Sequence, residues 1–269
     1  EVSSDLPVEY VTGEAMFCGR RFQVSPAVMI PRRSSEALVR EAVRLSQQKS
    51  ANGVVNETRV LDLGTGSGCL LLSAVLGVQT ALSELSESAG ASVTGVGLDI
   101  STDALKIASR NVSSLGLTER VSLVEGSFES MLETLCAHNS TSVTGDNGVK
   151  RKPFDVILCN PPYSSYKDKS RLSVACRKHE PAVALFAPRH SRVDLEGGSE
   201  EGTMGAYYMI ARSLAAIHQR DSALRSTHID GSPDELQAQP LISVGAHMIV
   251  EMGHGQESDV RRILSTGAQ

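Results

Sequence analysis

Four consecutive residues carry the strongest chemical signal in the chain: Asn160, Pro161, Pro162 and Tyr163. They follow an apolar run, residues 154–159, which predicts a buried β-strand. Neither proline has a backbone N–H and both have a fixed φ, so the turn can hold the Asn160 side-chain oxygen and the Pro161 carbonyl as two rigid acceptors. Two acceptors suit a planar NH2 group, over which the Tyr163 ring can pack.

Such a group is an amide or an aromatic amine, and its nitrogen is a poor nucleophile because the lone pair is delocalised. Hydrogen bonds that orient both N–H groups aim this lone pair at an electrophilic methyl group. The nitrogen can lose its proton after the attack, so catalysis depends on positioning and desolvation more than on a strong base. The alternative interpretation is a proline-rich turn that merely ends the strand.

A glycine-rich turn follows an earlier apolar strand that contains Asp62. It consists of Gly64, Thr65, Gly66, Ser67 and Gly68. Glycines allow a tight turn and a close approach of the backbone to a ligand, and the helix that follows offers free N–H groups. This spacing is typical of S-adenosylmethionine enzymes, whereas a dinucleotide fingerprint needs glycine where Cys69 stands. A plain strand-to-helix turn is the alternative.

Asp99 ends the next predicted strand, 35 positions after Gly64. A carboxylate at this place can accept hydrogen bonds from both ribose hydroxyls of a nucleotide-like cofactor. The distance exceeds the roughly 20 positions usual for such an acid, and the Ser-rich stretch 83–92 accounts for the excess. The alternative is that Asp99 caps the helix that follows it.

The elements that must position these residues alternate along the chain. Strands are predicted at 59–63, 93–98, 121–124, 154–159 and 247–252, and helices at 35–45, 69–76, 103–111, 204–218 and 257–264. Polar stretches predict surface loops at 47–58, 83–92, 137–152 and 219–239. Alternation of this kind predicts an α/β fold with a doubly wound, mostly parallel, Rossmann-like sheet.

The first 30 residues have a different pattern, with short apolar stretches broken by Gly13, Gly19 and Pro26. Phe17, Phe22 and Val24 can face one side of a hairpin that turns near residues 18–21. We therefore expect an accessory hairpin segment at 1–30 and the main domain at 31–269.

Composition excludes several classes of protein. The 269 residues carry a net charge of −5 and include no Trp and only five Phe and five Tyr, so binding to nucleic acid through phosphates or base stacking is not expected. No apolar run approaches the ~20 residues that span a bilayer. Five cysteines without C-x-x-C spacing favour a reducing compartment, and seven scattered histidines form no metal motif.

Together, residues 62–68, Asp99 and residues 160–163 resemble the motifs of class I S-adenosylmethionine-dependent methyltransferases. More narrowly, the chain resembles the HemK/PrmC family, the release-factor glutamine N5-methyltransferases, with similar stretches at 22–36, 179–186 and 250–256. The resemblance implies a substrate site at Asn160, Pro161, Pro162 and Tyr163. It implies a cofactor site formed by Asp62, Gly64, Thr65, Gly66, Ser67, Gly68, Asp99, Phe128 and Asn160, with Asp99 at the ribose and Phe128 at the adenine.

The resemblance implies methyl transfer from S-adenosylmethionine to the glutamine of a Gly-Gly-Gln loop in a peptide chain release factor, in the cytoplasm or a mitochondrion. The charge and the composition of the chain predict no stable binding to nucleic acids or membranes. The chain departs from the family at Ser34 and Ser35, which replace an acid, and at Ser127. The family's seven-stranded sheet also needs closing strands that the predicted elements lack.

Two other functions stay open at this point. An adenine-N6 nucleic-acid methyltransferase also has to hold an exocyclic amine, and a flipped base can stack on Tyr163. A non-catalytic module that binds the cofactor or an assembly partner is the other alternative. A dehydrogenase that uses NAD is disfavoured by the glycine spacing.

Overall fold

The computed structural model describes residues 5–51, 57–85, 92–141, 152–187, 203–227 and 239–266. At its centre lie five strands: β3 (Glu57–Leu63), β4 (Ser92–Asp99), β5 (Val121–Glu125), β6 (Phe154–Cys159) and β7 (Ile242–Val250). Their spatial order is β5-β4-β3-β6-β7, and all four pairings are parallel. The predicted parallel α/β sheet is confirmed.

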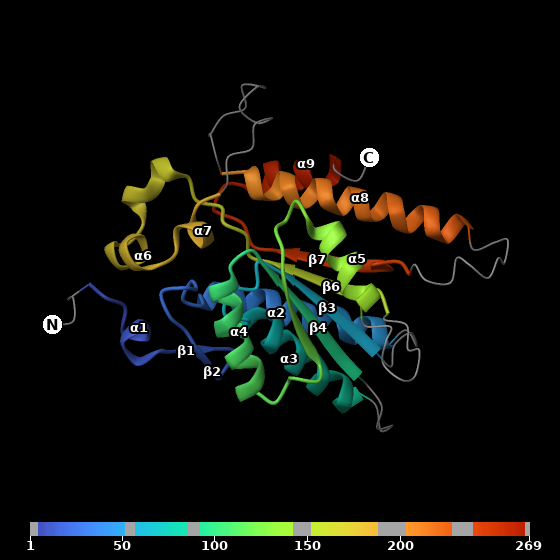
Figure 1. The fold of residues 1–269 in the computed structure, drawn as a ribbon, viewed down its shortest axis with the longest axis horizontal. Helices are drawn as coiled ribbons and strands as arrows, with labels where there is room; N and C mark the ends of the chain where they lie inside the picture. The colour runs from blue at the N-terminus through green and yellow to red at the C-terminus, as the bar shows by residue number, and fades with distance from the viewer. Residues whose placement is uncertain are drawn as a thin grey trace.

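Helices cover both faces of this sheet (Figure 1). One face carries α2 (Glu36–Ala51), α3 (Cys69–Leu85) and α4 (Thr102–Ser114), and the other carries α5 (Met131–Thr141), α8 (Gly205–Thr227) and α9 (Glu257–Thr266). Because side chains alternate along a strand, Val60 joins the core under α2 and α3, whereas Leu61 and Leu63 join the core under α5 and α8. All six residues of β6 are buried, as expected for a strand that is covered on both sides.

The strand order reverses between β3 and β6. The chain first runs outward from β3 through β4 to β5, and it then returns to place β6 on the other side of β3. In open α/β sheets, ligands bind at this point, outside the carboxyl ends of the strands. The glycine turn follows β3 and Asn160 follows β6, so the topology brings the two strongest sequence motifs together.

The N-terminal segment forms the predicted hairpin, which confirms that expectation. After a short helix, α1 (Val8–Thr12), strands β1 (Glu14–Phe17) and β2 (Arg20–Gln23) pair antiparallel. The turn residues Cys18 and Gly19 both have positive φ, 46° and 71°, which suits a tight two-residue turn. Phe17 and Phe22 are buried and pack edge to face.

One buried side chain fastens this hairpin to the main domain. The Asn111 carboxamide on α4 accepts from Gln23 N at 2.7 Å and donates to the carbonyl oxygens of Gln23 and Ser67 at 3.0 Å and 2.8 Å. Asn111 therefore links the hairpin, α4 and the glycine turn, and it fixes the hairpin beside the carboxyl ends of the strands.

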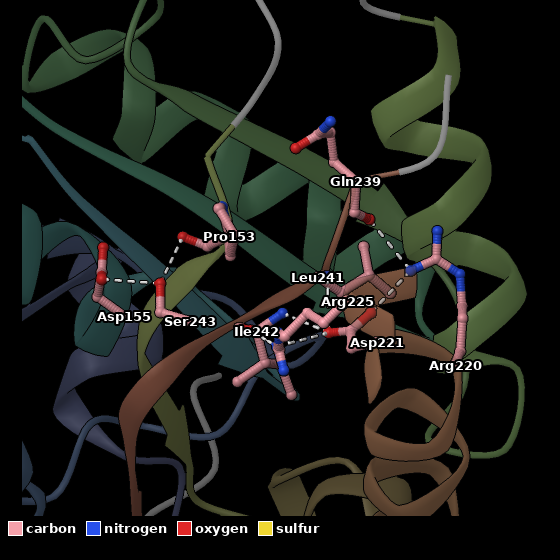
Figure 2. A network of polar contacts seen from close by, with 9 residues as sticks. All are labelled: Pro153, Asp155, Arg220, Asp221, Arg225, Gln239, Leu241, Ile242 and Ser243. Carbon is pink, nitrogen blue, oxygen red and sulfur yellow. Dashed lines mark hydrogen bonds and ion pairs between the residues drawn. The ribbon is translucent and has the colours of Figure 1, made fainter. Parts of the chain in front are cut away.

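A second polar network fixes the start of β7. Figure 2 shows the Asp221 carboxylate of α8 directed at the first residues of this strand. Asp221 Oδ2 accepts from the backbone N–H groups of Leu241 and Ile242 at 2.8 Å and 2.9 Å, and Arg220 pairs with Oδ1 at 2.8 Å. This anchor holds β7 beside β6, so the other end of β7 meets the residues that follow β6.

Several predicted boundaries were wrong. The loops predicted at 47–58, 137–152 and 219–239 are helical at 47–51, 137–141 and 219–227, and residues 57–58 belong to β3. The loop predicted at 83–92 is helical to Leu85, and β4 begins at Ser92. Strand β7 spans residues 242–250, not 247–252. Polar helix ends such as that of α8 are stabilised by tertiary contacts like those of Asp221, which local patterns do not reveal. Apart from residues 152 and 239, the remainder of these loops lies outside the described residues.

Five short elements of the described residues have no counterpart among the predictions. They are α1, η1 (Arg33–Ser35), η3 (Tyr166–Arg171), α6 (Val174–His179) and α7 (Ala182–Leu185). The last three lie between β6 and α8, at the same end of the sheet as the hairpin (Figure 1). In the described part of the chain, no helix is both long and apolar enough to cross a bilayer.

Candidate active site

A cavity of about 660 Å³ lies at the carboxyl ends of the strands. Its floor is formed by residues that directly follow four of them: 64–67 after β3, 99–101 after β4, 126–129 after β5, and Asn160 and Pro162 after β6. Its other walls are residues 27–35 of the segment after the hairpin and residues 181–187 around α7, in part. A volume of this size is typical of small-molecule and cofactor sites, which measure roughly 300–1,000 Å³.

The glycine turn has the backbone conformation that its composition predicts. Gly64, Gly66 and Gly68 have φ values of 74°, 55° and 80°, in the left-handed region that favours glycine. The N–H groups of Gly64 and Thr65 both donate to Leu98 O in β4, at 2.8 Å and 3.0 Å. The turn is therefore tied to the neighbouring strand and presents its backbone to the cavity.

Asp99 lines the cavity beside this turn. Its Oδ2 accepts from Gly66 N at 2.8 Å, and its Oδ1 accepts from Ser101 N at 2.9 Å. Burial raises the pKa of Asp99, and these N–H groups counteract that shift. The N-cap of α4 is Ser101, whose Oγ accepts from Ala104 N at 3.2 Å, so the capping alternative for Asp99 is wrong.

Asp62 lies behind the turn and does not line the cavity. It is fully buried, and its Oδ2 accepts from Thr65 Oγ1 at 2.7 Å. Its Oδ1 has no hydrogen-bond partner within the described ranges. Burial is the main cause that raises the pKa of Asp62 to about 7. Asp62 therefore supports the turn from behind the cavity lining. Gly68 also lies outside the lining. A Cβ added at Gly68 would lie 3.3 Å from the Leu72 side chain.

Asn160 lines the cavity just after β6, the strand that neighbours β3. Its Nδ2 donates to Ser35 Oγ at 3.2 Å, and Ser35 is a buried residue at the end of η1. This contact orients the carboxamide and leaves Oδ1 as its acceptor end. Pro162 also lines the cavity, whereas Pro161 is buried and lies outside the lining.

Tyr163 lies outside the lining as well. It is half-buried and packs in a cluster with Met204, Tyr207 and Met252. Burial, followed by the nearby charge of Glu251, raises the pKa of the Tyr163 phenol.

Phe128 lies where the sequence places an aromatic side chain. It lines the cavity, and its ring is 3.5 Å from the point where a Cβ on Gly64 would stand. Ser213 Oγ on α8 donates to Phe128 O at 2.6 Å, which fixes the loop that carries the ring.

The structure adds cavity residues that the sequence analysis did not assign. Tyr166 stacks on Phe186, with ring centroids 4.2 Å apart, and both line the cavity. Arg32 lines it too, and Arg32 Nη2 bonds both carboxylate oxygens of Glu180 at 2.6 Å and 2.7 Å. For Arg32, Glu180 and Phe186, the signal in the sequence was the pair of stretches 22–36 and 179–186, which indicated a family but no role; Tyr166 had no such signal.

Residues 55–189, about half of the chain, match a family model described as a methyltransferase domain. The chain belongs to this family. The chain is 34% identical over 184 residues to the release factor glutamine methyltransferase of Chlorobaculum tepidum, which is 68% of this chain and 53% of that protein. It is 28% identical over 262 residues to the protein of that name from Bradyrhizobium diazoefficiens, 97% of this chain and 65% of that protein.

A third relative is the ribosomal protein uL3 glutamine methyltransferase of Bordetella pertussis, 34% identical over 184 residues, 68% of this chain and 50% of that protein. The chain thus spans between half and two thirds of the length of these three relatives. The resemblance that the motifs indicated is confirmed.

The cofactor of this methyltransferase domain is S-adenosylmethionine, as the glycine spacing predicts. The residues present fit it. The Asp99 carboxylate, which Gly66 N holds in place, offers acceptors for ribose hydroxyls. Phe128 offers a flat apolar face for adenine. Both residues line the cavity together with the glycine turn.

Proposed function

We propose that this methyltransferase domain methylates the side-chain amide nitrogen of a glutamine in the Gly-Gly-Gln loop of a peptide chain release factor. The observation that carries the proposal is the orientation of Asn160. Its Nδ2 is held by Ser35, so that its oxygen is the end available to a planar NH2 group, next to the glycine turn. The names of the relatives from Chlorobaculum and Bradyrhizobium support the choice of substrate.

In this proposal, Asn160 Oδ1 and the Pro161 carbonyl each accept one N–H of the substrate amide. The two contacts fix the plane of the amide, and the nitrogen lone pair then points toward the cofactor site. Bound S-adenosylmethionine supplies a methyl group on a sulfonium sulfur, which leaves as a neutral thioether when nitrogen takes the methyl. The nitrogen releases a proton after the transfer, so the chain need not provide a strong base.

The cofactor would be held by the backbone of residues 64–67 and by two side chains. Asp99 would accept from the ribose hydroxyls, since Gly66 and Ser101 already fix its orientation. Phe128 would stack on the adenine. Asp62, Gly68 and Tyr163 would act from behind the lining, by shaping the two turns.

The direct test is mass spectrometry of a release factor after incubation with this protein and S-adenosylmethionine that carries a deuterated methyl group. We expect one added methyl group, on the glutamine of the Gly-Gly-Gln loop, and none when that glutamine is replaced by alanine. Transfer to adenine in RNA or DNA would instead support the nucleic-acid alternative. Transfer only to a glutamine of ribosomal protein uL3 would indicate the substrate named for the Bordetella relative.

A matched variant separates an enzyme from a cofactor-binding module. We expect Asn160→Ala to lose methyl transfer while it keeps the melting temperature, because Asn160 is a half-buried residue outside the core. A release factor that is never methylated, but that binds equally well to both forms, would identify an assembly module.

We further propose that residues 1–30 are an accessory segment of the domain at 31–269, and that the protein acts in a reducing compartment, the cytoplasm or a mitochondrion. All five cysteines are free thiols, which supports such a compartment. Fractionation of source cells with an antibody against the chain tests the location.

A further inference from the structure

The segment after β7, residues 251–256, lies behind the turn that carries Asn160. Glu251 N donates to Cys159 O at 2.9 Å, which extends the pairing of β6 and β7 by one step. Five residues later, Gln256 Nε2 donates to Tyr163 O at 3.2 Å. The segment therefore holds residues 160–163 at both ends, although neither Glu251 nor Gln256 lines the cavity.

Glu251 also connects to the other support of Asn160. Its Oε1 accepts from Ser34 Oγ at 3.5 Å, and Ser34 precedes Ser35, which holds the Asn160 amide. Its backbone oxygen accepts from the Tyr207 hydroxyl at 3.0 Å. Glu251 thus lies between η1, the turn after β6 and helix α8, where it can set the distances between them.

The carboxylate of Glu251 is not explained by stability. Its Oε2 is buried and makes no hydrogen bond of good geometry in the described ranges, although the Tyr163 phenol interacts with this carboxylate; the described residues give Glu251 no ion pair. A buried carboxylate that has neither a well-aligned donor nor a cation lowers the free energy of unfolding, and a neutral side chain of the same shape would avoid that loss. A residue retained only for packing has no need of this charge.

The Gln256 carboxamide forms one hydrogen bond through its oxygen and another through its nitrogen. Its Oε1 accepts from Gly253 N at 2.9 Å while its Nε2 holds Tyr163 O. A Cβ at position 253 would lie 2.9 Å from Gln256 Oε1, so the glycine makes room for this contact. The carboxamide needs both a donor and an acceptor here, which excludes glutamate as an equivalent.

We propose that Glu251 and Gln256 are positioning residues for methyl transfer: together they brace residues 160–163 and the Ser34–Ser35 turn so that the two amide acceptors keep their spacing. The inference rests on the proposed function, because it concerns the step in which the substrate amide is oriented. The brace acts on the substrate side of the cavity, so cofactor affinity does not depend on it.

The first test is Glu251→Gln, which keeps the shape and removes the charge. We expect kcat with release factor to fall at least tenfold, about 1.4 kcal/mol of lost positioning, while the melting temperature stays equal or rises. The dissociation constant for S-adenosylhomocysteine, measured by calorimetry, should stay within twofold. The matched control is Glu125→Gln, at the exposed end of β5, which should change none of the three.

The second variant, Gln256→Glu, replaces the donor to Tyr163 O by an acceptor. We expect a similar fall in kcat, again with cofactor affinity unchanged. The inference is overturned if either variant keeps kcat within twofold of the parent. It is also overturned if kcat, melting temperature and cofactor affinity fall together, since that pattern describes a merely structural residue. Absence of methylation by the parent protein would instead refute the proposed function.

Discussion

The carboxamide of Asn160 is held by a hydroxyl from a distant part of the chain, with Ser35 Oγ 3.2 Å from Asn160 Nδ2. Ser35 belongs to a short helical turn before α2, and Asn160 follows β6. Ser34 and Ser35 stand where the family that the chain resembles often has an acid. Here a buried serine orients the amide, and in the proposed function this orientation decides which atom of Asn160 meets the substrate.

This relationship predicts the effect of Ser35→Ala. Without the hydroxyl, the Asn160 carboxamide loses the contact that selects its orientation, which is worth about 1 kcal/mol. We expect kcat for release factor to fall roughly five- to tenfold, with the affinity for S-adenosylhomocysteine nearly unchanged. Ser113→Ala, on the exposed side of α4, is the control. An unchanged kcat would show that Asn160 does not need Ser35.

Asp99 should govern cofactor affinity. Asp99→Asn loses one acceptor, so either the N–H of Gly66 or that of Ser101 loses its partner, and so does a ribose hydroxyl. Hydrogen bonds to a charged group contribute about 1.5–3 kcal/mol, so we expect the dissociation constant for S-adenosylhomocysteine to rise at least tenfold. Calorimetry measures this value, with the exposed Asp103→Asn as the control. A change below threefold would remove Asp99 from the cofactor site.

Asp62 predicts a pH dependence of stability. Its pKa in the folded chain is about 7, above the ordinary value of 3.8 for an aspartate, so the folded state keeps a proton that the unfolded state loses first. The free energy of unfolding therefore falls as pH rises between these values, by up to about 1.4 kcal/mol per pH unit, and then levels off.

The variant Asp62→Asn removes this titration. Urea denaturation at pH 5 and pH 8 should show that the variant gains stability relative to the parent as pH rises. Asp99, whose pKa is also raised by burial, is present in both proteins and largely cancels in the comparison. Parallel stability curves for the two proteins would contradict the prediction.

The pair of Arg32 and Glu180 predicts an asymmetry between two substitutions. The Glu180 side chain is 2% exposed, whereas that of Arg32 is 37% exposed. Arg32→Met leaves a buried carboxylate without its cation and should lower the free energy of unfolding by about 3 kcal/mol. Glu180→Gln leaves a guanidinium that water can reach, so its effect should be about 1 kcal/mol. Equal losses in chemical denaturation would show that burial does not control the pair.

Much of the fold follows from local patterns. The sequences of β3 and β6 are short, apolar and flanked by turn residues, so their pattern predicts strands. The ends of α8 and α5 were missed because their last turns are polar. Such turns remain helical because their side chains contact distant residues. In α8, for example, Asp221 accepts hydrogen bonds from the backbone N–H groups at the start of β7.

The sequence by itself determined where a turn for a cofactor and a turn for an amide are predicted, because glycine turns, a strand-end acid and paired prolines constrain the backbone locally. Only the tertiary structure decided which of them face the cavity. Asn160, Pro162, Asp99 and Phe128 line it, whereas Asp62 and Tyr163 lie behind. The supports from Ser35, Glu251 and Gln256 are equally invisible in the sequence, because hydrogen bonds between distant segments depend on how strands and helices pack.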